Sequence, residues 1–265
     1  MKQEEYQAHI QVGRARPSTS SSLADVEFTT LCPPDVQPQS RILAVVGPND
    51  LNDCSSPLAD GWFHSDFYLF HYLLRLPKFR SRKQTWLTCV SPKTLVEKYQ
   101  EFTHGDPKTD RRVVLDASML PAIEQSNNIR VVHEKELLDT FLTLLEEESN
   151  NATRDNARLL VLIFGQGDMS NHGFAIGGIG DSLRAPKLTL QDFRERLCHD
   201  AEVSLLATSC YASGWVVKPS VWDLDSLDQH YAKGIASAGP KHASFAWDSR
   251  KSSGRAAGSI LPPPF

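Results

Sequence analysis

The stretch Leu159–Phe164, which reads LLVLIF, decides the fold of this chain. It is apolar at every position, whereas a strand with one face in water alternates between apolar and polar residues. It is also too short for a typical helix and ends at a glycine, Gly165. The stretch therefore predicts a strand buried on both faces, at the centre of a mostly parallel sheet.

Similar apolar runs and helical patterns lie on both sides of this strand. We expect further strands over residues 42–46, 86–90, 113–115, 131–133, 203–207 and 235–238. We expect helices over residues 65–76, 95–102 and 134–148, a fourth helix that begins at Thr189, and a hairpin over 173–178. Strands that alternate with helices predict an α/β fold of three layers, a mostly parallel sheet flanked by helices.

Composition and charge exclude several classes of protein. The 265 residues carry a net charge of −4, which argues against a large nucleic-acid footprint. The longest apolar run, Leu159–Phe164, is far too short to cross a membrane, and the polar N-terminus does not resemble a targeting signal. Residues 1–36 are rich in Ser, Thr, Pro and Gln, and we expect them to form a disordered tail.

The cysteines indicate a reducing compartment. There are five of them, an odd number, and no two form a CxxC pair, so neither a disulfide framework nor a zinc site is expected. We expect free thiols in the cytoplasm or the nucleus. No pattern in the sequence requires a metal or a cofactor.

Two predicted strand ends carry the residues of chemical interest. Residues 165–168 (GQGD) follow the first strand, and residues 208–214 (TSCYASG) follow the strand over 203–207. In parallel sheets, functional groups gather beyond the carboxyl ends of the strands. Cys210 could be a reachable thiol beside free backbone N–H groups; the alternative is a buried structural cysteine next to a glycine-rich turn. A dinucleotide site is disfavoured because the third glycine of its motif is missing.

These two segments, LLVLIFGQG and VSLLATSCYASG, resemble the active-site strands of caspase-like cysteine peptidases, the group of caspases, metacaspases and legumains. In that group one strand ends in His-Gly and the next in a Cys followed by small residues. The chain is most similar to small, uncharacterised fungal members, from Ile42 through Gly258. The similar segments include FHSDFYLFHYLL, FTHGDPKTDRRVVLD, SCYASGW and GRAAGS.

The resemblance assigns roles to three residues. Cys210 matches the nucleophile, and Gly167 matches the glycine whose N–H, with that of the cysteine, forms the oxyanion hole. Gln166 stands where the family has its general-base histidine. An amide cannot take the thiol proton, and the loss of acid–base help typically costs about 10²–10⁴-fold in rate. We therefore expect an inactive or weakly active peptidase homologue with a binding role.

Two alternatives remain open. The chain could be an active cysteine hydrolase in which another base serves Cys210, with His172 as the candidate, although an exposed turn histidine is the plainer interpretation. His199 is expected at the opposite edge of the sheet. The chain could also be an accessory protein in a fungal secondary metabolic pathway.

The substrate pocket is less well defined by the resemblance. Metacaspases and legumains have an acid two residues before the cysteine, and here this position is Thr208, so no preference for Arg or Lys is implied. Thr208 and Asp168 are the candidate substrate-binding residues, although Asp168 also fits a solvated loop residue. The expected partner is a peptide or a protein.

The resemblance also gives the domain bounds. We expect a caspase-like domain over residues 37–258 and an irregular, proline-rich end over 259–265. The similar fungal proteins continue past the GRAAGS segment, so we expect that this chain is truncated at its C-terminus.

Overall fold

The computed structural model describes residues 39–75, 83–106, 111–178, 185–215 and 232–237, together with 241 and 244. The expected tail (1–36) and proline-rich end (259–265) lie outside these residues. The strands are β1 (Arg41–Val46), β2 (Gln84–Thr88), β3 (Phe102–His104), β4 (Arg112–Leu115), β5 (Ile129–Val131), β6 (Leu159–Phe164), β7 (Phe174–Ala175), β8 (Lys187–Leu188), β9 (Val203–Ala207) and β10 (Ala232–Ala236). The helices are α2 (Gly61–Leu74), α3 (Pro92–Tyr99), α4 (Leu120–Ser126), α5 (Leu137–Arg154) and α6 (Leu190–Arg196), with short 3₁₀ turns η1 (Leu51–Asp53) and η3 (Ala212–Trp215).

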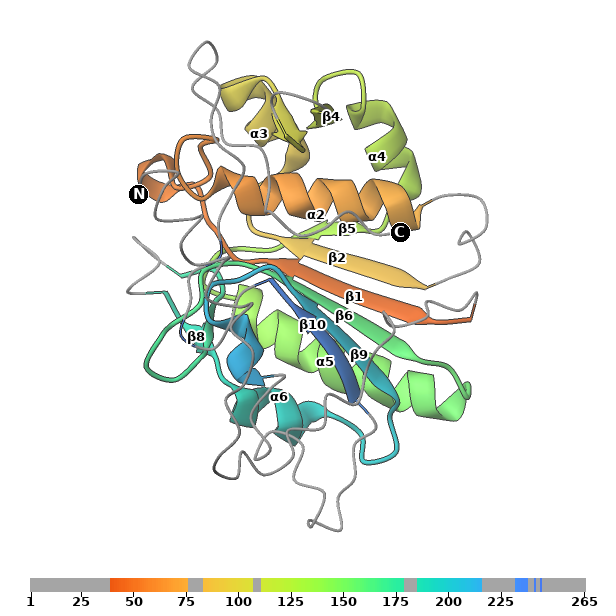
Figure 1. The fold of residues 1–265 in the computed structure, drawn as a ribbon. Coiled ribbons are helices and arrows are strands. Elements are labelled where there is room, and N and C mark those ends of the chain that lie inside the picture. The colour runs from red at the N-terminus through yellow and green to blue at the C-terminus, as the bar shows by residue number, and fades with distance from the viewer. Residues whose placement is uncertain are drawn as a thin grey trace, which may run out of the picture.

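The centre of the molecule is a six-stranded sheet in the order β10-β9-β6-β1-β2-β5. All its strand pairs are parallel. Helices α2, α3 and α4 lie on one side of the sheet, and α5 and α6 lie on the other (Figure 1). The predicted fold class, a three-layer α/β arrangement around a mostly parallel sheet, is confirmed, and it is consistent with a caspase-like fold.

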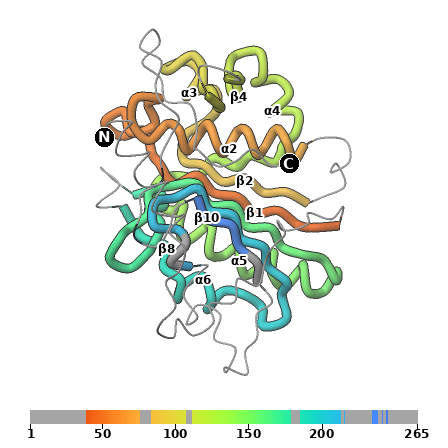
Figure 2. The backbone as a smooth tube through the Cα atoms, in the orientation of Figure 1, coloured from red at the N-terminus to blue at the C-terminus, as the bar shows by residue number. Residues whose placement is uncertain are grey.

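Strand β6 is buried on both faces, as its sequence predicts. None of its side chains is more than 5% exposed. Leu159, Val161 and Ile163 join the core under α5 and α6, while Leu160, Leu162 and Phe164 join the core under α2. The alternation of side chains along a strand therefore divides one apolar run between two cores. The smooth trace in Figure 2 shows the green strand β6 between the orange β1 and the cyan β9.

Helix α2 begins at Gly61, four residues before the predicted start at Ser65, and ends at Leu74. Its first half is buried around most of its circumference, because the helix lies between the sheet and the antiparallel pair β3–β4. Phe67 packs edge-on against Trp86 and Phe164, at ring-centroid distances of 5.2 and 5.8 Å. The first half buries the polar residues His64, Ser65 and Asp66 together with its aromatic residues, so its burial does not follow an apolar helical pattern, which explains the late predicted start.

Several other predicted bounds are wrong in the structure. The helix predicted over 95–102 spans Pro92–Tyr99, and Phe102 belongs to β3, because Gln100 ends the helix at a φ of 69°. Helix α4 was not expected. The predicted strands over 86–90 and 131–133 begin two residues earlier, at Gln84 and Ile129, and the one over 235–238 corresponds to β10.

The hairpin expected over residues 173–178 is also wrong in its extent. Only its first strand, β7, lies there, and β7 pairs antiparallel with β8 at Lys187–Leu188. By contrast, the helix predicted to open at Thr189 is confirmed. The Thr189 side chain accepts from the Asp192 N–H, and Asp192 accepts from the Thr189 N–H, which forms a capping box.

Among the described helices, none combines the length and the apolar character that a membrane span needs.

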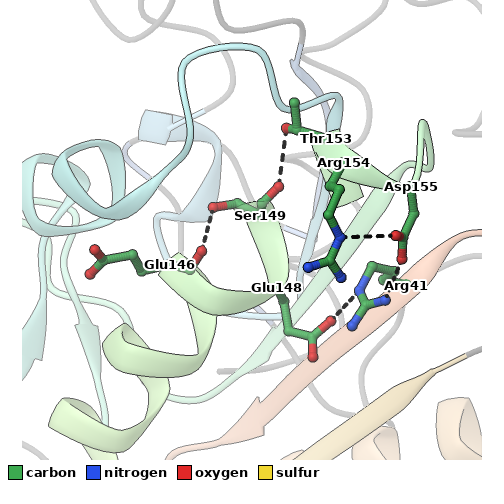
Figure 3. A network of polar contacts seen from close by, with 7 residues as sticks. All are labelled: Arg41, Glu146, Glu148, Ser149, Thr153, Arg154 and Asp155. Atoms are coloured by element: carbon green, nitrogen blue, oxygen red, sulfur yellow. Dashed lines mark hydrogen bonds and ion pairs between the residues drawn. The ribbon is translucent and has the colours of Figure 1, made fainter. Parts of the chain in front are cut away.

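A buried arginine joins β1 to the end of α5. The guanidinium of Arg41 donates to Glu148 at 2.5 Å and to Asp155 at 3.0 Å (Figure 3). The side chains of Arg41 and Glu148 are only 5% and 13% exposed. Removal of one partner from such a pair leaves an unpaired charge in a poorly solvated place.

We predict that Arg41→Met lowers the free energy of unfolding by about 3–5 kcal/mol, because Glu148 then keeps a buried charge with no cation beside it. Urea unfolding followed by circular dichroism measures this loss. The matched control is Arg196→Met, which breaks the exposed Arg196–Glu146 pair and should cost less than about 1 kcal/mol. Equal losses in the two variants would contradict the prediction.

Candidate functional site

Parallel pairing brings the two strand ends of interest together. Ile163 of β6 and Ala207 of β9 are register partners, and the Thr208 N–H donates to the Ile163 carbonyl at 3.1 Å. Both strands end at the same edge of the sheet. Gln166 and Cys210, which are 44 residues apart in sequence, are therefore in contact.

The sulfur of Cys210 faces an amide and a backbone segment. Its S–H donates to Gln166 Oε1 at 3.6 Å, and the Ser244 carbonyl is a more distant acceptor at 3.9 Å. The Ser244 N–H donates to the sulfur at 3.3 Å. Within the described residues, no histidine forms a hydrogen bond with this sulfur. The thiol therefore has an acceptor that can hold its proton in place but cannot take it away.

Burial raises the pKa of the Cys210 thiol above its ordinary value, because a thiolate is poorly solvated there. The N–H of Ser244 opposes this effect, the negative charge of Asp60 adds to it, and the N–H groups of Cys210 and Gly167 oppose it. Burial is the largest of these causes. Cys210 is therefore held as a neutral thiol, the less nucleophilic form.

The other end of the Gln166 amide contacts a carboxyl group. Gln166 Nε2 donates to Asp60 Oδ1 at 2.7 Å. Asp60 precedes the first residue of α2 and is partly buried, which raises the pKa of its carboxyl group; the Gln166 hydrogen bond partly offsets this effect. Hydrogen bonds thus connect the side chain of Asp60 to that of Gln166, and the side chain of Gln166 to that of Cys210.

Gly167 is held tightly between the strand ends. It forms a bridge with Phe174, and a Cβ on Gly167 would lie 1.8 Å from the carbonyl oxygen of Cys210. No other residue type fits there without a shift of backbone. The N–H groups of Gly167 and Cys210 both lower the pKa of the Cys210 thiol, so both lie near its sulfur.

The two candidate substrate-binding residues lie in different surroundings. Thr208 is fully buried, and its hydroxyl has no hydrogen-bond partner among the described residues. Asp168 lies on the loop after Gly167, where its Oδ1 accepts from the N–H and the hydroxyl of Ser170. These bonds lower the pKa of Asp168, so it is a charged loop residue.

Neither His172 nor His199 forms one of the hydrogen bonds to Cys210 Sγ described above. The backbone of His172 is held by the Trp215 indole, which donates to its carbonyl at 2.7 Å, and its buried Nδ1 has no partner among the described residues. His199 follows α6 and precedes β9, at the amino edge of the sheet, as expected, and contacts Asp200.

A small cavity of about 20 Å³ lies beside the Asp60–Gln166 bond. A space of this size is close to what a single water molecule needs, and too small for a substrate side chain. Its lining residues are Gly47, Pro48, Asn49, Cys54, Asp60, Gln166, Ala175, Gly177 and Ala185.

Sequence reasoning missed two residues of the site, Asp60 and Ser244. Asp60 is 106 residues from Gln166, and Ser244 is 34 residues from Cys210. Neither belongs to a local motif, so only the packing of the chain reveals them. The signal nearest to Asp60 is its place just before a helix, which is common for an aspartate at any N-terminus.

Metal binding finds no support in this region. Within the part of the chain that the structure describes, no group of three or more His, Cys, Asp or Glu side chains is arranged to hold an ion.

No protein-family model and no curated protein sequence matches this chain.

We predict that alkylation of Cys210 by iodoacetamide rises with pH at a midpoint above that of an ordinary thiol. Burial raises the pKa, so the reactive thiolate appears only at higher pH. The rate at each pH is read from the Cys210 peptide by mass spectrometry. The control is the same thiol in the urea-unfolded chain, and a folded midpoint at or below the unfolded one would show the prediction to be wrong.

We also predict that Gly167→Ala lowers the free energy of unfolding by about 1–3 kcal/mol, the usual cost of a methyl group where no space exists. Urea unfolding measures the change. Gly173→Ala is the matched control, because its Cβ would meet the side-chain oxygen of Asn171 at 3.0 Å and the Leu188 carbonyl oxygen at 3.2 Å, a much milder crowding than the backbone contact at 1.8 Å. A smaller loss for Gly167→Ala than for Gly173→Ala would count against this account.

Proposed function

We propose that this chain is a caspase-like cysteine peptidase homologue in which Gln166 replaces the general base. In this proposal peptidase activity is lost or nearly lost, and the site serves to bind a peptide or a protein. The observation that carries the proposal is the contact between Cys210 Sγ and Gln166 Oε1, at 3.6 Å, where the resemblance expects an imidazole.

The chemistry of the two side chains explains the loss of activity. An imidazole removes the thiol proton and later returns it to the leaving amine. The Gln166 oxygen can only accept a hydrogen bond, so the proton stays on sulfur. Oxyanion donors beside a thiol that keeps its proton leave a site that can bind a carbonyl group and cannot attack it efficiently.

Two apolar side chains are exposed on the loops that carry Asp60 and Gln166. Leu58 and Met169 are 75% and 64% exposed. They lie on the two loops that the Asp60–Gln166 hydrogen bond joins, two residues before Asp60 and three after Gln166. Within this proposal the partner is a peptide or protein in the cytoplasm.

We predict that Gln166→His increases cleavage of a fluorescent casein by about 10²–10⁴-fold over the unaltered chain, because the imidazole supplies a base beside Cys210. Gln166→Asn is the matched control, since it changes the same side chain and adds no titratable group, and it should show no gain. Cys210→Ala in the Gln166→His background should remove the gained activity.

The same assay separates this function from an active hydrolase that uses His172. If the unaltered chain cleaves as fast as Gln166→His, and Cys210→Ala abolishes both activities, the loss-of-activity proposal fails. If His172→Ala also removes the activity of the unaltered chain, His172 is the base.

A further inference from the structure

Gln166 has two chemically different ends, and its orientation decides what Cys210 faces. The amide oxygen accepts hydrogen bonds, while the amide NH₂ only donates them. In the structure Oε1 faces Cys210 Sγ at 3.6 Å and Nε2 faces Asp60 Oδ1 at 2.7 Å. A rotation of the amide by 180° exchanges these two ends.

The orientation has a direct consequence for the thiol. With Oε1 toward the sulfur, the S–H has an acceptor and the neutral thiol is favoured. With Nε2 toward the sulfur, the amide donates to a thiolate and favours the charged form. The state of Cys210 therefore depends on which group holds the far end of Gln166.

Asp60 is the group that holds it. An ionised carboxylate has acceptors and no donor, so it pairs with the NH₂ of Gln166 and excludes the reverse orientation. The 2.7 Å separation is that of a charge-assisted hydrogen bond, which is stronger than one between neutral groups. The partner is also fixed in place, because Asp60 directly precedes α2, whose first residues are buried.

We propose that Asp60 is a positioning residue that acts on Cys210 through Gln166, by fixing the amide oxygen toward the sulfur. The proposal deepens the proposed function and rests on it, since it explains how the glutamine keeps the thiol protonated. It also implies that in Gln166→His the carboxylate of Asp60 would orient the imidazole ring.

The test measures the alkylation of Cys210 by iodoacetamide against pH in the full chain. Asp60→Asn is nearly isosteric and permits the reverse orientation of Gln166, because its own amide can donate to Oε1. We expect the midpoint for Cys210 to fall by about one pH unit, which is about a tenfold faster reaction below the midpoint. Asp53→Asn is the matched control. It removes a carboxylate from the same loop that pairs with Lys98, at 2.6 Å, and should leave the midpoint unchanged.

A double-mutant cycle separates positioning from simple charge repulsion. Gln166→Met keeps the length of the side chain and removes both hydrogen-bonding atoms. If Asp60 acts through Gln166, Asp60→Asn should shift the midpoint by less than half as much in the Gln166→Met background. A shift at least half as large there means that the charge acts directly on the sulfur, and overturns the proposal. The absence of any lowering by Asp60→Asn in the unaltered background overturns it as well.

A second measurement does not depend on a substitution at Asp60. It therefore tests the proposal even if Asp60→Asn fails to fold. The side-chain NH₂ protons of Gln166 are observed by ¹⁵N NMR and assigned by their loss in Gln166→Met. We expect their shifts to titrate at a midpoint above the ordinary aspartate range, since burial raises the pKa of Asp60. Shifts that do not change over this range would overturn the proposal. These readouts do not use peptidase activity, so their failure is distinguishable from a failure of the proposed function.

Discussion

The burial of β6 on both faces is the constraint on which the rest of the molecule depends. A strand that is covered on both faces must satisfy its backbone groups through neighbouring strands, and β6 does so with β1 and β9. Because both pairings are parallel, the carboxyl ends of the strands meet at one edge. Gln166 and Cys210 contact each other for this reason, and Gly47, after β1, lies at the same edge, where its N–H donates to the Phe164 carbonyl.

At that edge Gln166 forms hydrogen bonds on two sides, but its amide cannot take up a proton near neutral pH. The amide contacts the thiol on one side and a carboxylate on the other, as an imidazole between a nucleophile and an orienting acid does. Hydrogen bonds thus connect Asp60 to Gln166 and Gln166 to Cys210. The middle group of the three does not titrate near neutral pH, because it is an amide.

The sequence predicted the elements whose residues carry their own pattern. The bounds of β6 and β9 were predicted correctly, because each is a short apolar run with a clear end, and Thr189 with Asp192 forms the cap expected at the start of α6. The start of α2, the place of Phe102 and the existence of α4 were not predicted. For the start of α2 and the place of Phe102, contact with other parts of the chain contributes: α2 packs on β3 and β4, and β3 pairs with β4.

By itself, the sequence determined the three-layer α/β class, the central strand, and the two segments whose ends carry Gln166 and Cys210. The reason is that hydrophobic patterning and strand ends are local properties of the chain. Only the tertiary structure decided which groups surround the sulfur. Asp60 and Ser244 reach the site from distant segments, and the direction of the Gln166 amide follows from a contact across 106 residues. The chemical state of the thiol depends on these long-range contacts, because burial and neighbouring charges exist only once the chain has folded.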